Sequence, residues 1–189
     1  MTYLKQIQTY VPINDQELAD KKGILALIDQ YPLTILSREN PVAHITSSGF
    51  ILNPTLDKTL FVHHNIYQSW AWTGGHVDGN PDLLAVAMAE AQEESGVSTT
   101  PLSVHMASLD ILPVHGHVKN GVYVSTHLHL SVAYLLIADD SAPLSHKPDE
   151  NSGVRWFDVA DMTSANFSEQ DVYLYTKLVN RARSSCLLR

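Results

Sequence analysis

Three glutamates, Glu90, Glu93 and Glu94, lie close together in the segment AEAQEESGV. At spacings of three and four residues, helical side chains share one face and span an arc of roughly 100°. Like charges at these spacings repel, and the negative end of the helix dipole opposes them as well. No Lys or Arg occurs from residue 59 to 118 to relieve this repulsion. A hard divalent cation such as Mg²⁺ or Mn²⁺ would relieve it, because such ions bind carboxylate oxygens.

The main alternative for this cluster is a solvated acidic face, which is the commoner meaning of a short run of helical acids. The preceding segment favours a site instead. Gly74, Gly75 and Gly79 predict a flexible turn just before the helix. Such a turn exposes backbone N–H and carbonyl groups to a ligand or metal ion.

The helix that carries the acids is predicted at about residues 80–95. Asn80 is a suitable N-cap, and Pro81 and Asp82 suit the first turn. Gly96 is suited to the left-handed conformation that ends many helices. These limits place the three glutamates in the last two turns.

The rest of the chain predicts strands, one central helix, further strands and a closing helix. Strands are predicted at 43–53, 58–64, 66–72, 102–114, 121–139 and 154–157, and helices at 14–31 and 167–185. This order indicates an α/β domain with helices packed on a mixed sheet. We expect one domain over residues 1–189, with residues 1–40 as an N-terminal helical extension.

Composition narrows the function classes. The net charge of −8 argues against a nucleic-acid polymer as partner, because such binding depends on clustered Lys and Arg. The N-terminus lacks a signal-peptide pattern, and no apolar run reaches membrane-spanning length. The single cysteine, Cys186, allows no disulfide within one chain. We therefore expect a cytoplasmic protein that does not bind membranes.

From Gly75 onward, the segment resembles the Nudix box, G-x5-E-x7-R-E-U-x-E-E-x-G-U, in which U is aliphatic. Glu90, Glu93 and Glu94 fall on the three clustered glutamates of that signature. Gly96 falls on its last glycine.

Two further segments carry the resemblance to the Nudix (MutT-like) hydrolases. Residues 72–75, WTGG, are similar to the family's aromatic-x-Pro-Gly-Gly entry, and 155–162, RWFDVADM, to its later Trp-Phe strand. Two positions depart from the signature, since Ala89 stands in place of the arginine and Pro81 in place of the early glutamate. Asp78 or Asp82 is a possible substitute for the latter.

The resemblance implies an α/β/α sandwich with a mixed sheet and a pyrophosphatase activity. The substrate would be a nucleoside diphosphate linked to another group, and a metal-activated water would attack phosphorus. By this resemblance, Mg²⁺ or Mn²⁺ is held by Glu90, Glu93 and Glu94, with a carbonyl of Gly74 or Gly75 as a further ligand. We expect Glu93 to be the general base, followed by Glu150. Without the signature arginine, a distant cation such as Lys119 or Arg155 would order the acids.

Several histidines add a second candidate region. His127 and His129 share one face of a predicted strand, and His115 and His117 precede them in HGHVKN. His76 directly follows the glycine pair. We expect His76, His127, His129 and Lys119 to contact substrate, while structural roles and a second, histidine-rich metal site remain open.

The sequence leaves open two other functions and one oligomeric state. A Nudix-like binding or sensor module without turnover is favoured by Ala89 and Pro81. A Nudix-fold isomerase would need a nucleophile such as cysteine, and Cys186 lies outside the expected site. A homodimer is possible, as in other members of the family.

Overall fold

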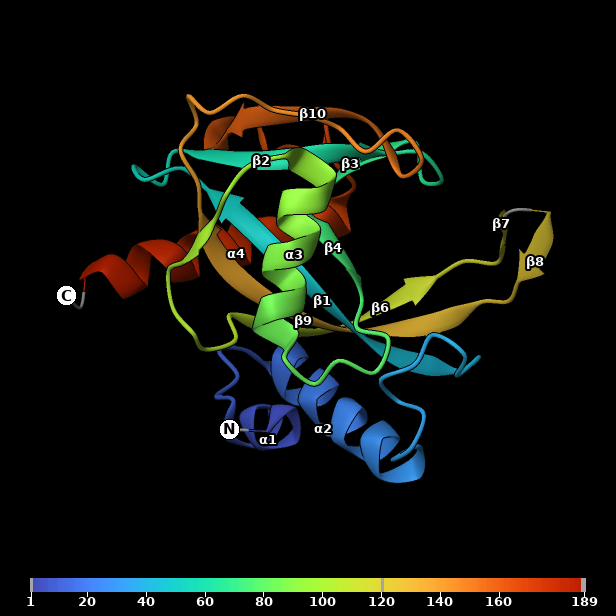
Figure 1. Ribbon diagram of the computed structural model, residues 1–189. Coiled ribbons are helices and arrows are strands. Elements are labelled where there is room, and N and C mark those ends of the chain that lie inside the picture. The colour runs from blue at the N-terminus through green and yellow to red at the C-terminus, as the bar shows by residue number, and fades with distance from the viewer. Residues whose placement is uncertain (1, 120, 188–189) are drawn as a thin grey trace.

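The computed structural model describes residues 2–119 and 121–187 (Figure 1). Its helices are α1 (Tyr3–Thr9), α2 (Asp15–Gln30), α3 (Leu83–Ser95) and α4 (Glu169–Leu187), with a 3-10 turn at Val159–Asp161. Its strands are β1 (Ala43–Leu52), β2 (Lys58–His64), β3 (Ser69–Ala71), β4 (Thr73–His76), β5 (Thr100–Pro101), β6 (Ser108–Val114), β7 (His117–Lys119), β8 (Val122–Val124), β9 (His127–Ile137) and β10 (Asn151–Asp158). Among the described residues, no helix is long and apolar enough to cross a membrane.

The main sheet is mixed, with the order β10-β2-β1-β9-β5. β1 and β9 are parallel over ten residue pairs, whereas β4 and β6 pair antiparallel with β1 and β9 respectively. Every residue of β1 is buried, which is expected for a central strand that is covered on both faces. The predicted α/β fold with a mixed sheet is confirmed.

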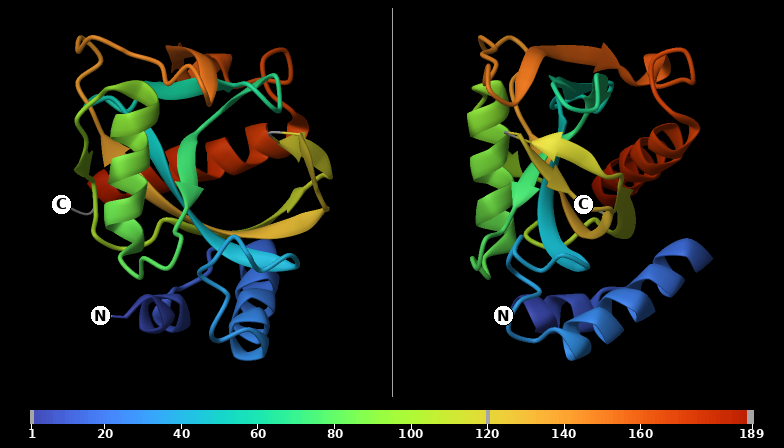
Figure 2. Two further views of the ribbon diagram at one scale, coloured as in Figure 1. Left: turned by 45° about the vertical axis from the view of Figure 1, so that its right-hand side comes forward. Right: turned by 90° about the vertical axis from the view of Figure 1, so that its right-hand side faces the viewer.

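Two hydrophobic clusters cover the two faces of β1. Ile45 and Ile51 pack with residues of α1, α2 and α3, whereas Phe50 and Leu52 pack with residues of α4. Figure 2 shows α3 and α4 on opposite sides of the sheet, with α1 and α2 beneath it. Helices on both faces give the expected α/β/α sandwich.

The N-terminal helices are joined to the rest by buried charges. Lys177 Nζ on α4 lies 3.1 Å from Glu17 Oε1 on α2 and 2.6 Å from Asp110 Oδ1 on β6. The Tyr10 hydroxyl donates a 2.7 Å hydrogen bond to Glu17. These contacts fix α2 against the sheet, while the division into a domain and an extension stays a prediction.

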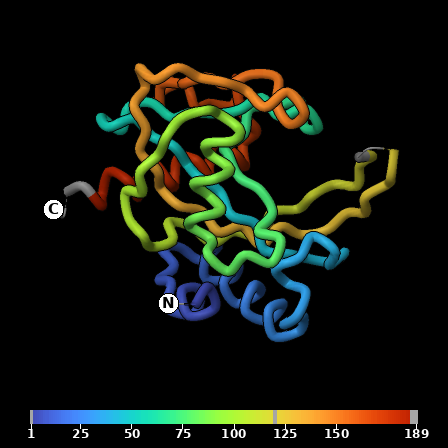
Figure 3. The backbone as a smooth tube through the Cα atoms, viewed as in Figure 1, coloured from blue at the N-terminus to red at the C-terminus, as the bar shows by residue number. Residues whose placement is uncertain are grey.

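The structure corrects several predicted boundaries. The expected strand at 66–72 is shortened to β3 by a tight turn, in which Gln68 has φ 50° and its N–H bonds His64 O. The expected strand at 121–139 is divided into β8 and β9. β7 and β8 form a separate hairpin that projects from the sheet (Figures 1 and 3). Helix α1 was not expected as a separate element.

The prediction of a flexible glycine turn before α3 was wrong for its first two residues. Gly74 and Gly75 lie in β4, where they pair with Ser48 and Ser47 of β1. Only Gly79 of the three has a positive φ, at 87°. Two glycines in a strand indicate close approach of other groups to the backbone rather than flexibility.

Candidate active site

The ends of α3 are fixed by short-range hydrogen bonds. Asp82 is the N-cap, and its side chain accepts a 3.1 Å bond from the Ala85 N–H. Asn80, the expected cap, instead accepts from the Asp82 N–H and shapes the approach to the helix. At the other end, Gly96 adopts the left-handed conformation with φ 76°, as predicted. These caps set the direction in which the glutamates of the last turns point.

The glycine pair of β4 lies directly against two of these glutamates. The Gly74 N–H donates a 3.1 Å hydrogen bond to Glu94 Oε2. A Cβ at Gly75 would lie only 2.3 Å from Glu90 Oε1. A side chain at position 75 would therefore displace the Glu90 carboxylate from its present place.

Glu90, Glu94 and Glu150 form the acid cluster, in which one carboxylate oxygen from each lies within 4.8 Å of the others. Two of the three come from α3, and Glu150 comes from the loop before β10. That loop is attached to the end of α3, since the Asn151 side-chain amide donates to Glu94 O at 3.0 Å. Chain segments far apart in sequence thus meet at one point.

Burial dominates the electrostatics of Glu90 and Glu94 in the acid cluster. Glu94 is 5% exposed, and burial raises the pKa of its carboxyl to about 8. Burial also raises the pKa of Glu90, and the charges of Glu150 and Glu93 add to the effect. Three carboxylates so close together match the oxygen ligands that Mg²⁺ and Mn²⁺ prefer, so the residues present fit the expected ion.

Glu93 lies beside the acid cluster rather than within it. Its carboxylate is 57% exposed and lies 3.1 Å from Lys147 Nζ, which is also 3.0 Å from Glu150 Oε1. The hydrogen bond to Glu150 is the main cause of a raised pKa for Lys147. Lys147 is thus the cation that joins Glu93 to the cluster, and nothing in its local sequence distinguishes it from a solvated loop lysine.

The other polar residues considered near the signature have different partners. Asp78 forms a two-bond ion pair with Arg38, and Asp82 caps α3. Arg155 lies over the Phe157 ring at 4.6 Å. Lys119 belongs to β7, and its side chain lies outside the described residues, as does that of Cys186.

A second group of titratable side chains, the histidine cluster, is formed by His44, His76, His127 and His129. The His44 ring lies at its centre, with centroid distances of 4.9 Å to His76, 4.9 Å to His127 and 5.0 Å to His129. Burial lowers the pKa of the His129 imidazole to about 3 and also lowers that of His44. His44 was not singled out from the sequence, because its position in a buried strand gives no local signal.

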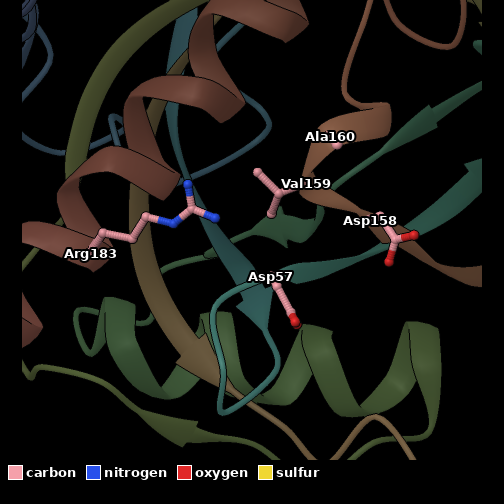
Figure 4. A pocket seen from close by; sticks show the side chains of 5 residues that line it. All are labelled: Asp57, Asp158, Val159, Ala160 and Arg183. Atoms are coloured by element: carbon pink, nitrogen blue, oxygen red, sulfur yellow. The ribbon is translucent and has the colours of Figure 1, made fainter.

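The histidines of the β7 segment are not part of this group. His115 is exposed, and His117 Nδ1 lies 3.0 Å from His115 O. A surface hollow elsewhere, lined by Asp57, Asp158, Val159, Ala160 and Arg183, includes no member of either cluster (Figure 4). The acid cluster and the histidine cluster both lie against β4, beside Gly75 and His76 respectively.

Comparison with known proteins defines the family. The model of the NUDIX domain matches residues 43–178, and the chain therefore belongs to the Nudix family, whose enzyme class is that of pyrophosphohydrolases. Comparison with curated proteins gave no match.

Two solved structures were compared with this chain. A Nudix-family hydrolase from Clostridium perfringens is 23% identical, with a TM-score of 0.52, and the alignment covers 72% of this chain and 96% of that one. An Ap4A hydrolase from C. elegans, solved as a binary complex, is 16% identical with a TM-score of 0.49, covering 76% and 97% respectively. At this identity, the first supports the fold alone.

Proposed function

We propose that this protein is a metal-dependent hydrolase that cleaves the diphosphate linkage of a nucleoside diphosphate joined to another group. The observation that carries the proposal is the acid cluster, with three carboxylates within 4.8 Å and one of them almost fully buried. Like charges at this separation are costly without a cation. A cluster of this kind in a Nudix-family chain is best explained as a site for Mg²⁺ or Mn²⁺.

Glu90, Glu94 and Glu150 would hold the ion, with Glu93 and the Gly75 carbonyl as further ligands expected from the signature. When bound, the ion supplies positive charge that screens the diphosphate and Lewis acidity that activates water. The Gly74 N–H orients the Glu94 carboxylate through their 3.1 Å hydrogen bond. Lys147 holds Glu93 and Glu150 on one side of the site.

Glu93 is the first choice for the general base, and Glu150 is the second. The exposed Glu93 carboxylate lies at the rim of the acid cluster, where it is accessible to a water molecule. A base must come within hydrogen-bonding distance of the proton that it removes. Glu93→Gln and Glu150→Gln separate the two, since the variant lacking the base should lose kcat that saturating Mn²⁺ does not restore.

The direct test of function is turnover. The purified chain should be incubated with ADP-ribose, nucleotide sugars, dinucleotides and nucleoside triphosphates in the presence of Mg²⁺ or Mn²⁺. We expect release of a nucleoside phosphate from at least one of them, and a loss of that activity in Glu94→Gln. Absence of turnover across the panel would contradict the proposal.

A binding or sensor module is the alternative, and it rests on Ala89 and Pro81, which replace signature residues. Retained ligand binding without turnover would support the module. The lysine that bridges Glu93 and Glu150 favours the hydrolase, because it provides a cation where the signature arginine is missing. Substrate contacts by His76, His127, His129 and Lys119, and a homodimer, stay predictions.

A further inference from the structure

The histidine cluster lies on the opposite face of β4 from the acid cluster. Gly75 faces Glu90, and successive residues of a strand point to opposite faces, so His76 points away from α3. The strand register also places these rings on one face. His76 of β4 pairs with Thr46 of β1, two residues from His44, and His44 pairs with His129 of β9. The four imidazoles therefore lie on the face of the sheet that α4 covers further along, and the carboxylates lie on the other face.

Hydrogen bonds fix the orientation of two of the rings. His44 Nδ1 lies 3.1 Å from Asn40 O, and His127 Nδ1 lies 2.8 Å from Ser125 O. A carbonyl oxygen only accepts, so each Nδ1 must carry the proton, which leaves Nε2 with a free lone pair. Metal-binding histidines are commonly oriented in this way, with the second ring nitrogen donating to a backbone carbonyl.

Two ring nitrogens of the cluster lack hydrogen-bond partners within the described chain. His44 Nε2 and His129 Nε2 are both buried and have none there. His44 is 3% exposed, so this nitrogen is also shielded from solvent. Buried polar atoms are normally paired, and an unpaired one requires an explanation such as a bound ion.

We propose that His44, His127 and His129 form a binding site for a late first-row transition-metal ion, with Zn²⁺ as the expected occupant. One nitrogen from each already lies within 4.8 Å of the others. Tetrahedral Zn²⁺ needs ligand nitrogens about 3.3 Å apart, which small side-chain rotations would provide. Imidazole favours such ions over Mg²⁺, so the two clusters select different metals.

The histidine cluster lies near the surface on one side, where His127 is 8% exposed and His129 is half-buried. Three histidines leave one position of a tetrahedral ion for water or an anionic oxygen. The His76 ring lies beside the three proposed ligands, with its centroid 5.1 Å from that of His129.

Cobalt spectroscopy tests the proposal without reference to activity. Metal-free protein should be titrated with Co²⁺, whose visible absorption reports ordered nitrogen ligands, and then with Zn²⁺ to displace it. We expect the visible band to saturate at one Co²⁺ per chain, and Zn²⁺ should raise the Tm of the protein. In His127→Gln, we expect Co²⁺ affinity to fall at least about tenfold.

Two controls make the result specific. His105→Gln removes an exposed histidine outside both clusters, and Glu94→Gln alters the acid cluster; both should bind Co²⁺ as the unmodified protein does. Circular dichroism checks folding, and His44→Asn is a second variant if His127→Gln is unstable. The proposal is overturned if Co²⁺ gives no visible band, if the band persists in a folded ligand variant, or if it shows sulfur charge transfer from Cys186.

Kinetic assays test whether the same rings bind substrate instead of a metal ion. A raised KM for a diphosphate substrate in His127→Gln, with no Co²⁺ binding by the unmodified protein, would assign the cluster to substrate and overturn the metal site. Failure of the diphosphatase proposal would leave the cobalt result unaffected, because the carboxylates take no part in this site.

Discussion

The acid cluster and the histidine cluster lie on opposite faces of one short strand and differ in almost every physical respect. The acid cluster consists of oxygen ligands that repel one another and are joined to Lys147 and to the Gly74 N–H. The histidine cluster consists of imidazole rings, and two of its buried nitrogens, His44 Nε2 and His129 Nε2, lack hydrogen-bond partners in the described chain. A charged oxygen site favours Mg²⁺ or Mn²⁺, whereas a neutral nitrogen site favours Zn²⁺. The two sites lie against adjacent residues of β4, Gly75 and His76, and their ligand chemistry distinguishes them.

The largest effect is expected from Glu94→Gln. Replacing this carboxylate removes a charged ligand from the acid cluster and leaves the histidine cluster intact. We expect kcat to fall by about 10² or more, the scale typical of losing one preorganised electrostatic group. Steady-state kinetics with the best substrate, beside His105→Gln as control, measures this. An unchanged kcat would remove Glu94 from the site.

Gly75→Ala should have the next largest effect. The added Cβ would lie 2.3 Å from Glu90 Oε1, so the carboxylate must shift from its position in the acid cluster. We expect about a tenfold or greater loss of kcat. Gly79→Ala is a matched control, because nothing lies within 4 Å of its Cβ but its φ of 87° is strained. It should lower stability by about 1–2 kcal/mol with little effect on kcat. Equal kcat values in the two variants would contradict the close-packing argument.

Lys147→Met tests whether the lysine orders the acids. Without its charge, Glu93 and Glu150 lose their shared partner, and repulsion within the acid cluster increases. We expect kcat to fall by about tenfold and the concentration of Mg²⁺ needed for half-activity to change. Lys147→Arg should restore most of the activity, and failure of this rescue would point to a role other than charge.

A smaller effect is expected on the pH dependence of the free energy of unfolding, measured on metal-free protein. The Glu94 carboxyl titrates at about 8 when folded, against an ordinary value of 4.5. Between these pH values, the folded state retains a proton that the unfolded state has lost. The resulting stabilisation is fully present below pH 4.5 and is lost as the pH rises through about 8.

Glu94→Gln removes this titration. Its Tm relative to the unmodified protein should therefore increase between pH 5 and pH 9, by roughly 2–4 °C for each kcal/mol. Thermal unfolding followed by circular dichroism at the two pH values checks this. A constant difference in Tm would mean that Glu94 is already ionised in the folded protein.

Patterns among neighbouring residues predicted the helices and strands whose limits depend on nearby sequence. Helical spacing and Gly96 located the end of α3, and the PTLD turn located β1 and β2 on either side of it. The glycine pair was misjudged as a turn, because a strand that needs glycine for close approach has the same sequence as a flexible loop. Only the position of Glu90 against Gly75 distinguishes the two.

The residues missed by sequence reasoning are those brought into place over long range. Lys147 reaches Glu93 across 54 positions of sequence, and His44 meets His129 only because β1 and β9 pair in parallel. Neither contact leaves a periodic signal, since it depends on loop path and strand order. Chemistry could be predicted from Glu90, Glu93 and Glu94, whereas the partners that complete each cluster required the fold.

The most direct test of the account is Mn²⁺ binding followed by electron paramagnetic resonance. The unmodified protein should bind Mn²⁺ through the acid cluster, and saturating Zn²⁺ at one equivalent should leave that binding in place. Glu94→Gln should weaken Mn²⁺ binding by about tenfold or more, while His127→Gln retains it. Mn²⁺ binding that is unaffected by Glu94→Gln but lost in His127→Gln would contradict the assignment of the two clusters.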